Sequence, residues 1–92
     1  MKYLILNLIL LFSVALTQKI IIPMDNSQND HLKAYGLSFW ILKQNDKIDW
    51  LLNYKGGSFL INAKQSYIQE AKYRGITYHA INVEELNNIL II

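Results

Sequence analysis

Short runs of β-branched and apolar residues alternate with helix-length segments along this chain. The apolar runs fall at residues 19–23, 48–53 and 76–81, and a segment long enough for a helix follows each. Such alternation favours a parallel sheet, because parallel neighbours need a long crossover connection that a helix supplies. The sequence therefore predicts an α/β fold with strand-helix alternation: a Rossmann-like, three-layer arrangement in which helices cover a parallel sheet.

Helix signals accompany this pattern. The first helix is expected to begin near Asn26 or Ser27, which are favourable N-cap residues. Large apolar residues at helical spacing predict its buried stripe: Leu32, Tyr35, Phe39 and Leu42, with Trp40 widening it. Two capping-box spacings and one C-terminal glycine indicate the later helices: Asn62 with Gln65, Asn82 with Glu85, and Gly75. Residues 59–61 fit either a short extended piece or a loop packed on the core.

The first seventeen residues are typical of a secretory signal peptide. Met1-Lys2 is a short basic start, residues 3–16 are almost wholly apolar, and a cut before Gln18 fits the sequence. The run is shorter than the roughly 20 apolar residues of a spanning helix. A retained anchor or a buried first helix is the alternative. We expect export to the periplasm or the medium, with no membrane anchor after cleavage.

Residues 18–92 are expected to form the N-terminal part of an α/β domain. Three parallel strands make a small sheet, and residues 89–92 are entirely apolar. We therefore expect the remainder of the same polypeptide to cover this small sheet and residues 89–92. Without Lys2 the net charge falls from +2 to about +1, and the lysines are scattered, which argues against a nucleic-acid-binding surface.

Polar clusters follow the first two predicted strands and mark the candidate site. Asp25, Gln28 and His31 follow the first strand at helix-turn spacing, and Asn53 to Ser58 follow the second. If the two strands run in parallel, both clusters lie at the same edge of the sheet, where open α/β folds bind ligands. Asp25 could orient His31 or hold a ligand hydroxyl, and Gln28 could donate its amide. Helix capping and solvation explain the same residues without a ligand.

The loop Lys55-Gly56-Gly57-Ser58 is the segment best suited to touch a ligand. Paired glycines let backbone N–H groups approach an anion, and Lys55 supplies charge. A tight turn that needs positive φ explains the glycines equally well. The loop is no P-loop, because its lysine precedes the glycines. His79 is expected to be structural, and two histidines without cysteine indicate no metal site and no evident cofactor.

Four stretches and one isolated position, spread over nearly the whole of residues 18–92, carry a resemblance to known proteins: Ile22-Pro23-Met24-Asp25, Gln28, His31 to Gly36 with Phe39-Trp40, Asp49 to Phe59, and Arg74-Gly75. In these residues the chain resembles a family of secreted bacterial proteins commonly labelled asparagine synthetase B. The family label implies an ATP-dependent amide-transfer enzyme. Established asparagine synthetases use an N-terminal cysteine and a Ser-Gly-Gly-x-Asp-Ser loop. This chain has no cysteine, and Gly56-Gly57-Ser58 lacks the leading serine and the aspartate.

Three hypotheses about function follow. The first is an exported α/β domain that binds a small polar ligand as part of a larger protein. The second is the amide-transfer enzyme that the family label implies. The third is a structural or partner-docking domain, whose signal would be an exposed aromatic face.

Overall fold

The computed structural model describes residues 18–91. The predicted signal segment, residues 1–17, lies outside the described residues. The elements follow one another in this order: β1 (Lys19–Ile22), α2 (His31–Lys43), β2 (Ile48–Leu51), β3 (Ser58–Asn62), α3 (Gln65–Arg74), β4 (His79–Ile81) and α4 (Val83–Ile91).

The four strands form one antiparallel sheet in the order β2-β3-β1-β4. The predicted parallel, Rossmann-like sheet is wrong. The segment around residues 59–61 is a full strand, β3, and it forms a hairpin with β2. β3 then lies between β2 and β1, so that the simple strand-helix alternation does not hold.

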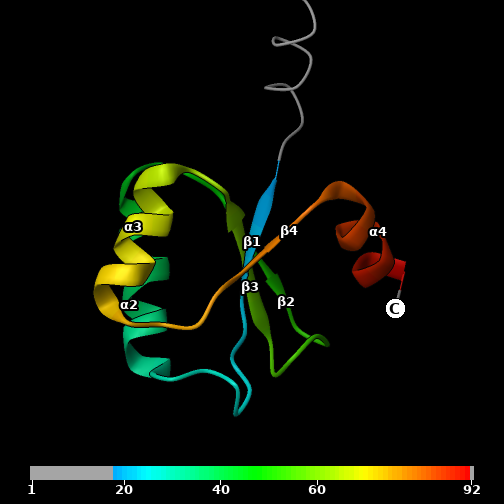
Figure 1. Ribbon diagram of the computed structural model, residues 1–92, viewed down its shortest axis with the longest axis horizontal. Helices are drawn as coiled ribbons and strands as arrows, with labels where there is room; N and C mark the ends of the chain where they lie inside the picture. Colours follow the sequence, from blue (N-terminus) through cyan, green and yellow to red (C-terminus); the bar gives the residue numbers. More distant parts are fainter. Residues whose placement is uncertain (1–17, 92) are drawn as a thin grey trace, which may run out of the picture.

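The continuous apolar run in β1 results from burial of both faces of the strand. It does not indicate whether the strand is parallel or antiparallel to its neighbours. Ile20, Ile21 and Ile22 are all buried, although parallel strands are the usual source of such continuous runs. Here the strand is central in an antiparallel sheet, and helices cover both of its faces. Figure 1 shows α2 and α3 on one side of the sheet and α4 on the other.

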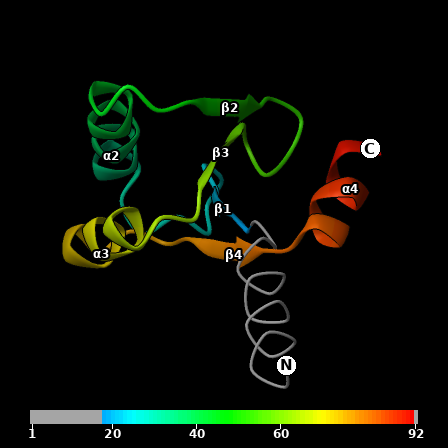
Figure 2. The same cartoon turned by 90° about the horizontal axis from the view of Figure 1, so that it is seen from above.

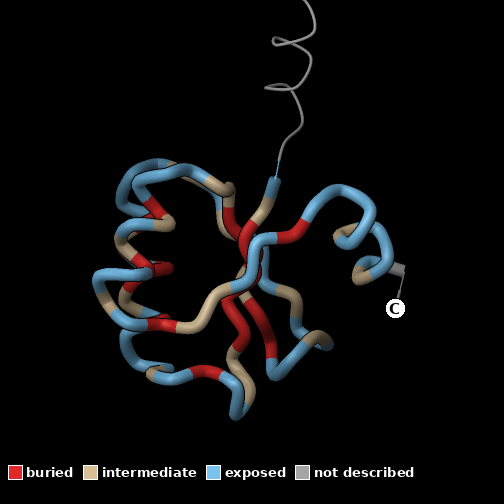
Figure 3. Tube along the Cα trace, viewed as in Figure 1, coloured by how far each residue is buried: buried red, intermediate tan, exposed pale blue. Residues whose placement is uncertain are grey.

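Two apolar clusters hold these layers together. The larger cluster joins the sheet to α2 and α3, and its buried members are Ile20, Ile22, Ala34, Leu37, Ile41, Ile61, Tyr67, Ala71 and Ile76. The smaller cluster lies beneath α4 and has three buried members: Ile21, Leu60 and Ile81. Burial is therefore concentrated in the central strands β1 and β3 and on the inner sides of α2 and α3 (Figure 3).

The buried face of α2 differs from the predicted one. Its buried residues are Ala34, Leu37, Ser38 and Ile41, whereas the predicted stripe is largely exposed. Both sets recur at the same helical spacing, so periodicity alone could not choose between them. The helix also begins later than predicted, because Asp30 is the N-cap and accepts from the Lys33 amide at 3.0 Å.

Polar contacts fix the turn between α2 and β2. The Asp46 carboxylate accepts hydrogen bonds from Asn62 Nδ2 at 2.9 Å and from the Tyr67 hydroxyl at 2.7 Å. Lys64 Nζ lies 3.5 Å from the same carboxylate. The predicted capping box of Asn62 is therefore wrong: its side chain bonds Asp46, and Lys64 precedes α3 without a side-chain cap. These bonds, led by the one from Tyr67, hold the pKa of Asp46 well below its ordinary value.

Candidate functional site

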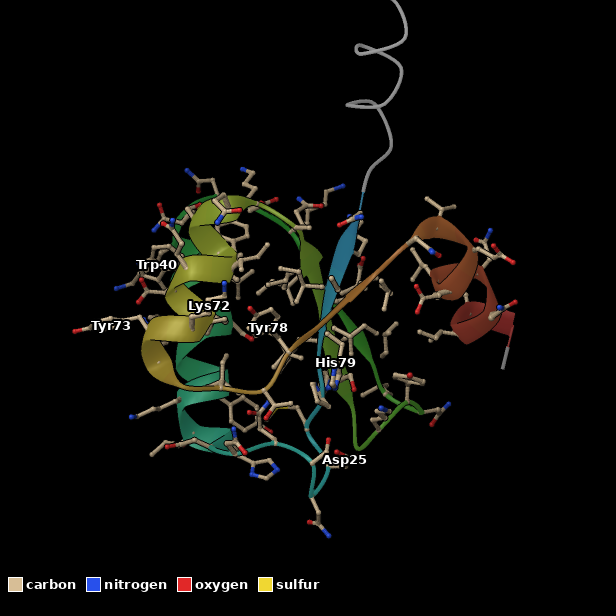
Figure 4. All side chains as sticks on the ribbon, viewed as in Figure 1. Asp25, Trp40, Lys72, Tyr73, Tyr78 and His79 are labelled. Carbon is tan, nitrogen blue, oxygen red and sulfur yellow. The ribbon has the colours of Figure 1, made fainter. Side chains whose placement is uncertain are left out.

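The two predicted loops meet at one edge of the sheet even though the sheet is antiparallel. β1 and β2 both run antiparallel to β3, which lies between them, so their C-terminal ends point the same way. The Met24 amide donates to the Lys55 carbonyl at 3.1 Å and joins the loops directly. Asp25 and His79 lie toward this end of the sheet in Figure 4.

Asp25 caps its own turn. Its carboxylate accepts from the hydroxyl and the amide of Ser27, and these two bonds, with Lys55 nearby, lower its pKa. His31 Nε2 lies 2.8 Å from the backbone oxygen of Asp25, so it does not pair with the carboxylate. The pair is therefore not arranged as an oriented acid-base couple.

Gln28 is a buried structural residue with all its hydrogen bonds made inside the protein. Its amide nitrogen donates to the carbonyls of Pro23 at 2.9 Å and Thr77 at 3.0 Å. Its oxygen accepts from the amides of Thr77 at 2.7 Å and Asn29 at 3.1 Å. With 5% of its surface exposed, this side chain ties the first loop to the segment before β4 and has no group left for a ligand.

The glycines of the second loop make room for neighbouring groups. Gly56 and Gly57 have φ of +76° and +89°, and a Cβ on Gly56 would lie 2.9 Å from the Met24 carbonyl oxygen. A Cβ on Gly57 would lie 2.9 Å from Trp50 Nε1. The turn and this close approach explain both glycines.

The hydrogen bonds of the same loop give little support to the predicted binding of an anion by its backbone N–H groups. The amides of Gly57 and Ser58 both donate to the Tyr54 carbonyl, at 3.0 and 2.9 Å. The Ser58 hydroxyl donates to that carbonyl as well, at 2.9 Å. These donors are therefore directed into the loop rather than toward a ligand.

Among the predicted site residues, Lys55 lines a polar pocket. The pocket has a volume of about 350 Å³, with β1 and β4 as its floor, and its lining includes Tyr54, Lys55, His79 and Glu85. Lys55 has φ of +44°, which is uncommon for a residue with a side chain. Asn53 lines a different pocket of about 170 Å³ that is mainly apolar and lies between this loop and α4. His79, expected to be structural, is exposed at the polar pocket.

An exposed apolar surface lies beside β2, where sequence analysis expected a buried stripe. We call it the aromatic face, and its residues are Leu32, Tyr35, Phe39, Leu42, Trp50 and Phe59. Leu32 is 82% exposed, Phe39 61% and Trp50 60%. The hydropathy pattern marked four of these residues as apolar, but it could not tell burial within the domain from burial against another surface.

The aromatic rings of this face are ordered by contacts with one another. Tyr35 meets Phe59 edge to face, with ring centroids 5.7 Å apart, and Trp50 stacks on Phe59 at 6.2 Å. Trp50 Nε1 donates to the Gly57 carbonyl at 2.8 Å. These contacts restrict the orientation of the three rings.

Within residues 18–91, no group of three His, Asp or Glu side chains is placed to hold a metal ion. No helix in that part of the chain is long and apolar enough to cross a membrane. No protein-family model, curated protein or solved structure matches the sequence or the fold.

Proposed function

We propose that this chain is an exported protein-docking domain whose aromatic face receives another protein surface. The observation that carries the proposal is a group of five exposed apolar residues on α2 and β2 that gathers around the half-buried Phe59 of β3. Large contiguous apolar patches are rare on proteins that act as monomers and mark interaction sites. Export rests on the predicted signal segment.

The chemistry of the face suits a protein interface. Tyr and Trp are enriched among the residues that contribute most to protein association. Their rings have few rotatable bonds, and the contacts among Tyr35, Trp50 and Phe59 restrict them further. Little side-chain entropy is then lost on binding, which favours affinity.

The composition of α2 supports the same proposal. This helix is apolar toward the core and apolar again along Leu32, Tyr35, Phe39 and Leu42. A helix that is apolar on opposite sides is normally buried on both. We therefore expect a partner protein to bury the exposed apolar side of α2.

Binding of a small polar ligand is the second candidate. It is supported by the pocket at Lys55, His79 and Glu85, whose volume of about 350 Å³ falls in the range of ligand sites. Membership of the family labelled asparagine synthetase B, and the amide-transfer activity that the label implies, stay predictions.

Hydroxyl-radical footprinting of the full-length protein, read by mass spectrometry, tests the docking function. Trp50, Tyr35 and Phe39 should be oxidised several-fold more slowly in the native protein than in the same protein in urea. Tyr73 is the matched control, because it is 88% exposed and lies on α3 outside the face. The Phe39→Ser variant should restore oxidation of Trp50, because it weakens binding at the aromatic face. Oxidation of Trp50 at the rate of Tyr73 in the native protein would overturn the proposal.

A further inference from the structure

The polar pocket on the α4 side of the sheet brings together distant segments of the chain. Figure 2 shows that the loop between β2 and β3 lies on the same side of the sheet as α4, opposite α2 and α3. The loop contributes Tyr54 and Lys55 to the lining, β4 contributes His79, and the first turn of α4 contributes Glu85. The pocket is therefore separate from the aromatic face, which lies on the side of α2.

The pocket carries charged groups of both signs that do not contact each other. Lys55 supplies an ammonium group and Glu85 a carboxylate. Within residues 18–91, no ion pair joins these two side chains. His79 adds at least one N–H donor, whichever way its ring is protonated. A ligand with a single charge would leave the opposite charge of the pocket without a partner, so a molecule that carries both charges is the better complement.

The backbone of Lys55 points to a role for its side chain. Its φ of +44° lies in the left-handed region, which glycine adopts without the steric cost that a side chain brings. The Lys55 carbonyl accepts from the Met24 amide at 3.1 Å and helps to hold this conformation. Its ammonium group lies 5.8 Å from the centre of the Tyr54 ring, which limits its positions. Strained residues of this kind cluster at ligand sites.

The capping box of α4 orients Glu85. The Glu85 amide donates to Asn82 Oδ1 at 2.8 Å, and Glu85 Oε1 accepts from the Asn82 amide at 3.3 Å. An ionised carboxylate can accept about four hydrogen bonds. The carboxylate is thus positioned by the protein and still able to bind an ammonium group.

We propose that this pocket binds a small zwitterion, a molecule with one ammonium group and one carboxylate or phosphate group. Lys55 and the ring N–H of His79 bind the anionic group, and Glu85 binds the ammonium group. All three side chains are exposed, so that a ligand can reach them from solvent. The volume of about 350 Å³ suits a molecule of this size. This inference does not depend on the docking function, and it names the chemical class for the second candidate function.

Calorimetric titration of the full-length protein with matched probes tests this inference. β-Alanine is the carboxylate zwitterion and phosphoethanolamine the phosphate zwitterion. Propionate and inorganic phosphate carry the same anionic groups without an ammonium group. We expect one zwitterion to bind about tenfold more tightly than its matched anion, because only the zwitterion gains a charge-assisted hydrogen bond to Glu85. The zwitterion that binds shows whether the anionic group is a carboxylate or a phosphate.

Two variants remove one charge each and keep the fold. Glu85→Gln retains the capping box, which glutamine also forms, and should reduce the affinity for the zwitterion to that of the matched anion. Lys55→Gly should weaken binding of the zwitterion by about tenfold without loss of stability in urea, because glycine tolerates the positive φ. Glu84→Gln is the control, since this residue lies in the same turn of α4 outside the pocket lining, and it should leave binding unchanged.

Several outcomes would overturn the proposal. Binding of neither zwitterion would exclude this ligand class. Equal affinity for a zwitterion and its matched anion, or zwitterion binding that survives Glu85→Gln, would show a site for anions only. A loss of stability in Lys55→Gly together with the loss of binding would assign Lys55 to the fold. None of these outcomes alters the footprinting of Trp50, so a failure here is distinguishable from a failure of the docking function.

Discussion

Replacement of Gln28 by alanine should destabilise the fold strongly, although this residue lies in a loop. The change removes both partners of Thr77 and the partner of the Pro23 carbonyl. A buried polar group left without a partner costs roughly 1–3 kcal/mol. Pro23 is buried, whereas Thr77 is half-buried and its groups regain water in part. We therefore expect a loss of about 2–4 kcal/mol in the free energy of unfolding.

Urea denaturation of the full-length protein, followed by tryptophan fluorescence, measures this loss. Gln28→Glu keeps the shape but loses the two donated bonds, so it should destabilise at least as much. Asn29→Ala is the control, because that side chain is exposed. A change below about 0.5 kcal/mol for Gln28→Ala, at an unchanged dependence on urea, would refute the structural role and return this residue to the candidate ligand donors.

Three further predictions concern stability. Because the pKa of Asp46 is lowered in the folded protein, its contribution to the free energy of unfolding is complete above the unfolded carboxyl pKa of about 3.9 and is lost as the pH falls. The Asp46→Asn variant should therefore lose less stability on acidification than the wild type, as measured by thermal denaturation at a series of pH values. Gly56→Ala should cost about 1–3 kcal/mol, because the new Cβ meets the Met24 carbonyl and φ stays positive; a stability equal to wild type in urea would contradict this. Asp30→Ala should cost about 1 kcal/mol through loss of the N-cap of α2, while Asn26→Ala, the cap predicted from sequence, should change little in the same assay.

Local hydrogen-bonding signals in the sequence predicted several features correctly. Gly75 ends α3 with φ of +70°, as a C-terminal glycine should. Asn82 and Glu85 form the predicted capping box at α4, with the Glu85 amide donating to Asn82 Oδ1 at 2.8 Å. Each of these features depends on neighbours within a few residues, which a sequence displays directly.

Features that depend on distant partners were not visible in the sequence. Strand direction is decided by pairings such as Ile20 with Ile61, and an apolar strand looks the same in either direction. The loop that contains Gly56 and Gly57 is typical of a hairpin between β2 and β3. The strand-helix alternation elsewhere in the chain nevertheless favoured a parallel sheet. In the candidate site, the sequence predicted that the loops after β1 and β2 lie side by side. It could not predict the hydrogen bonds between Gln28 and Thr77, because these residues are 49 positions apart in the chain.

The place of β1 in the sheet has a consequence for how the chain folds. β1 precedes the other strands of the described residues, yet its partners are β3 and β4, with Lys19 opposite Asn62 on one side and Ile81 on the other. Such contacts between distant parts of a chain slow folding. The hairpin of β2 and β3 can form locally, but the sheet cannot close around β1 until β4 has left the ribosome. If residues 1–17 direct export, this delay keeps the strand next to them unpaired while the chain is threaded through the membrane, and closure follows on the far side.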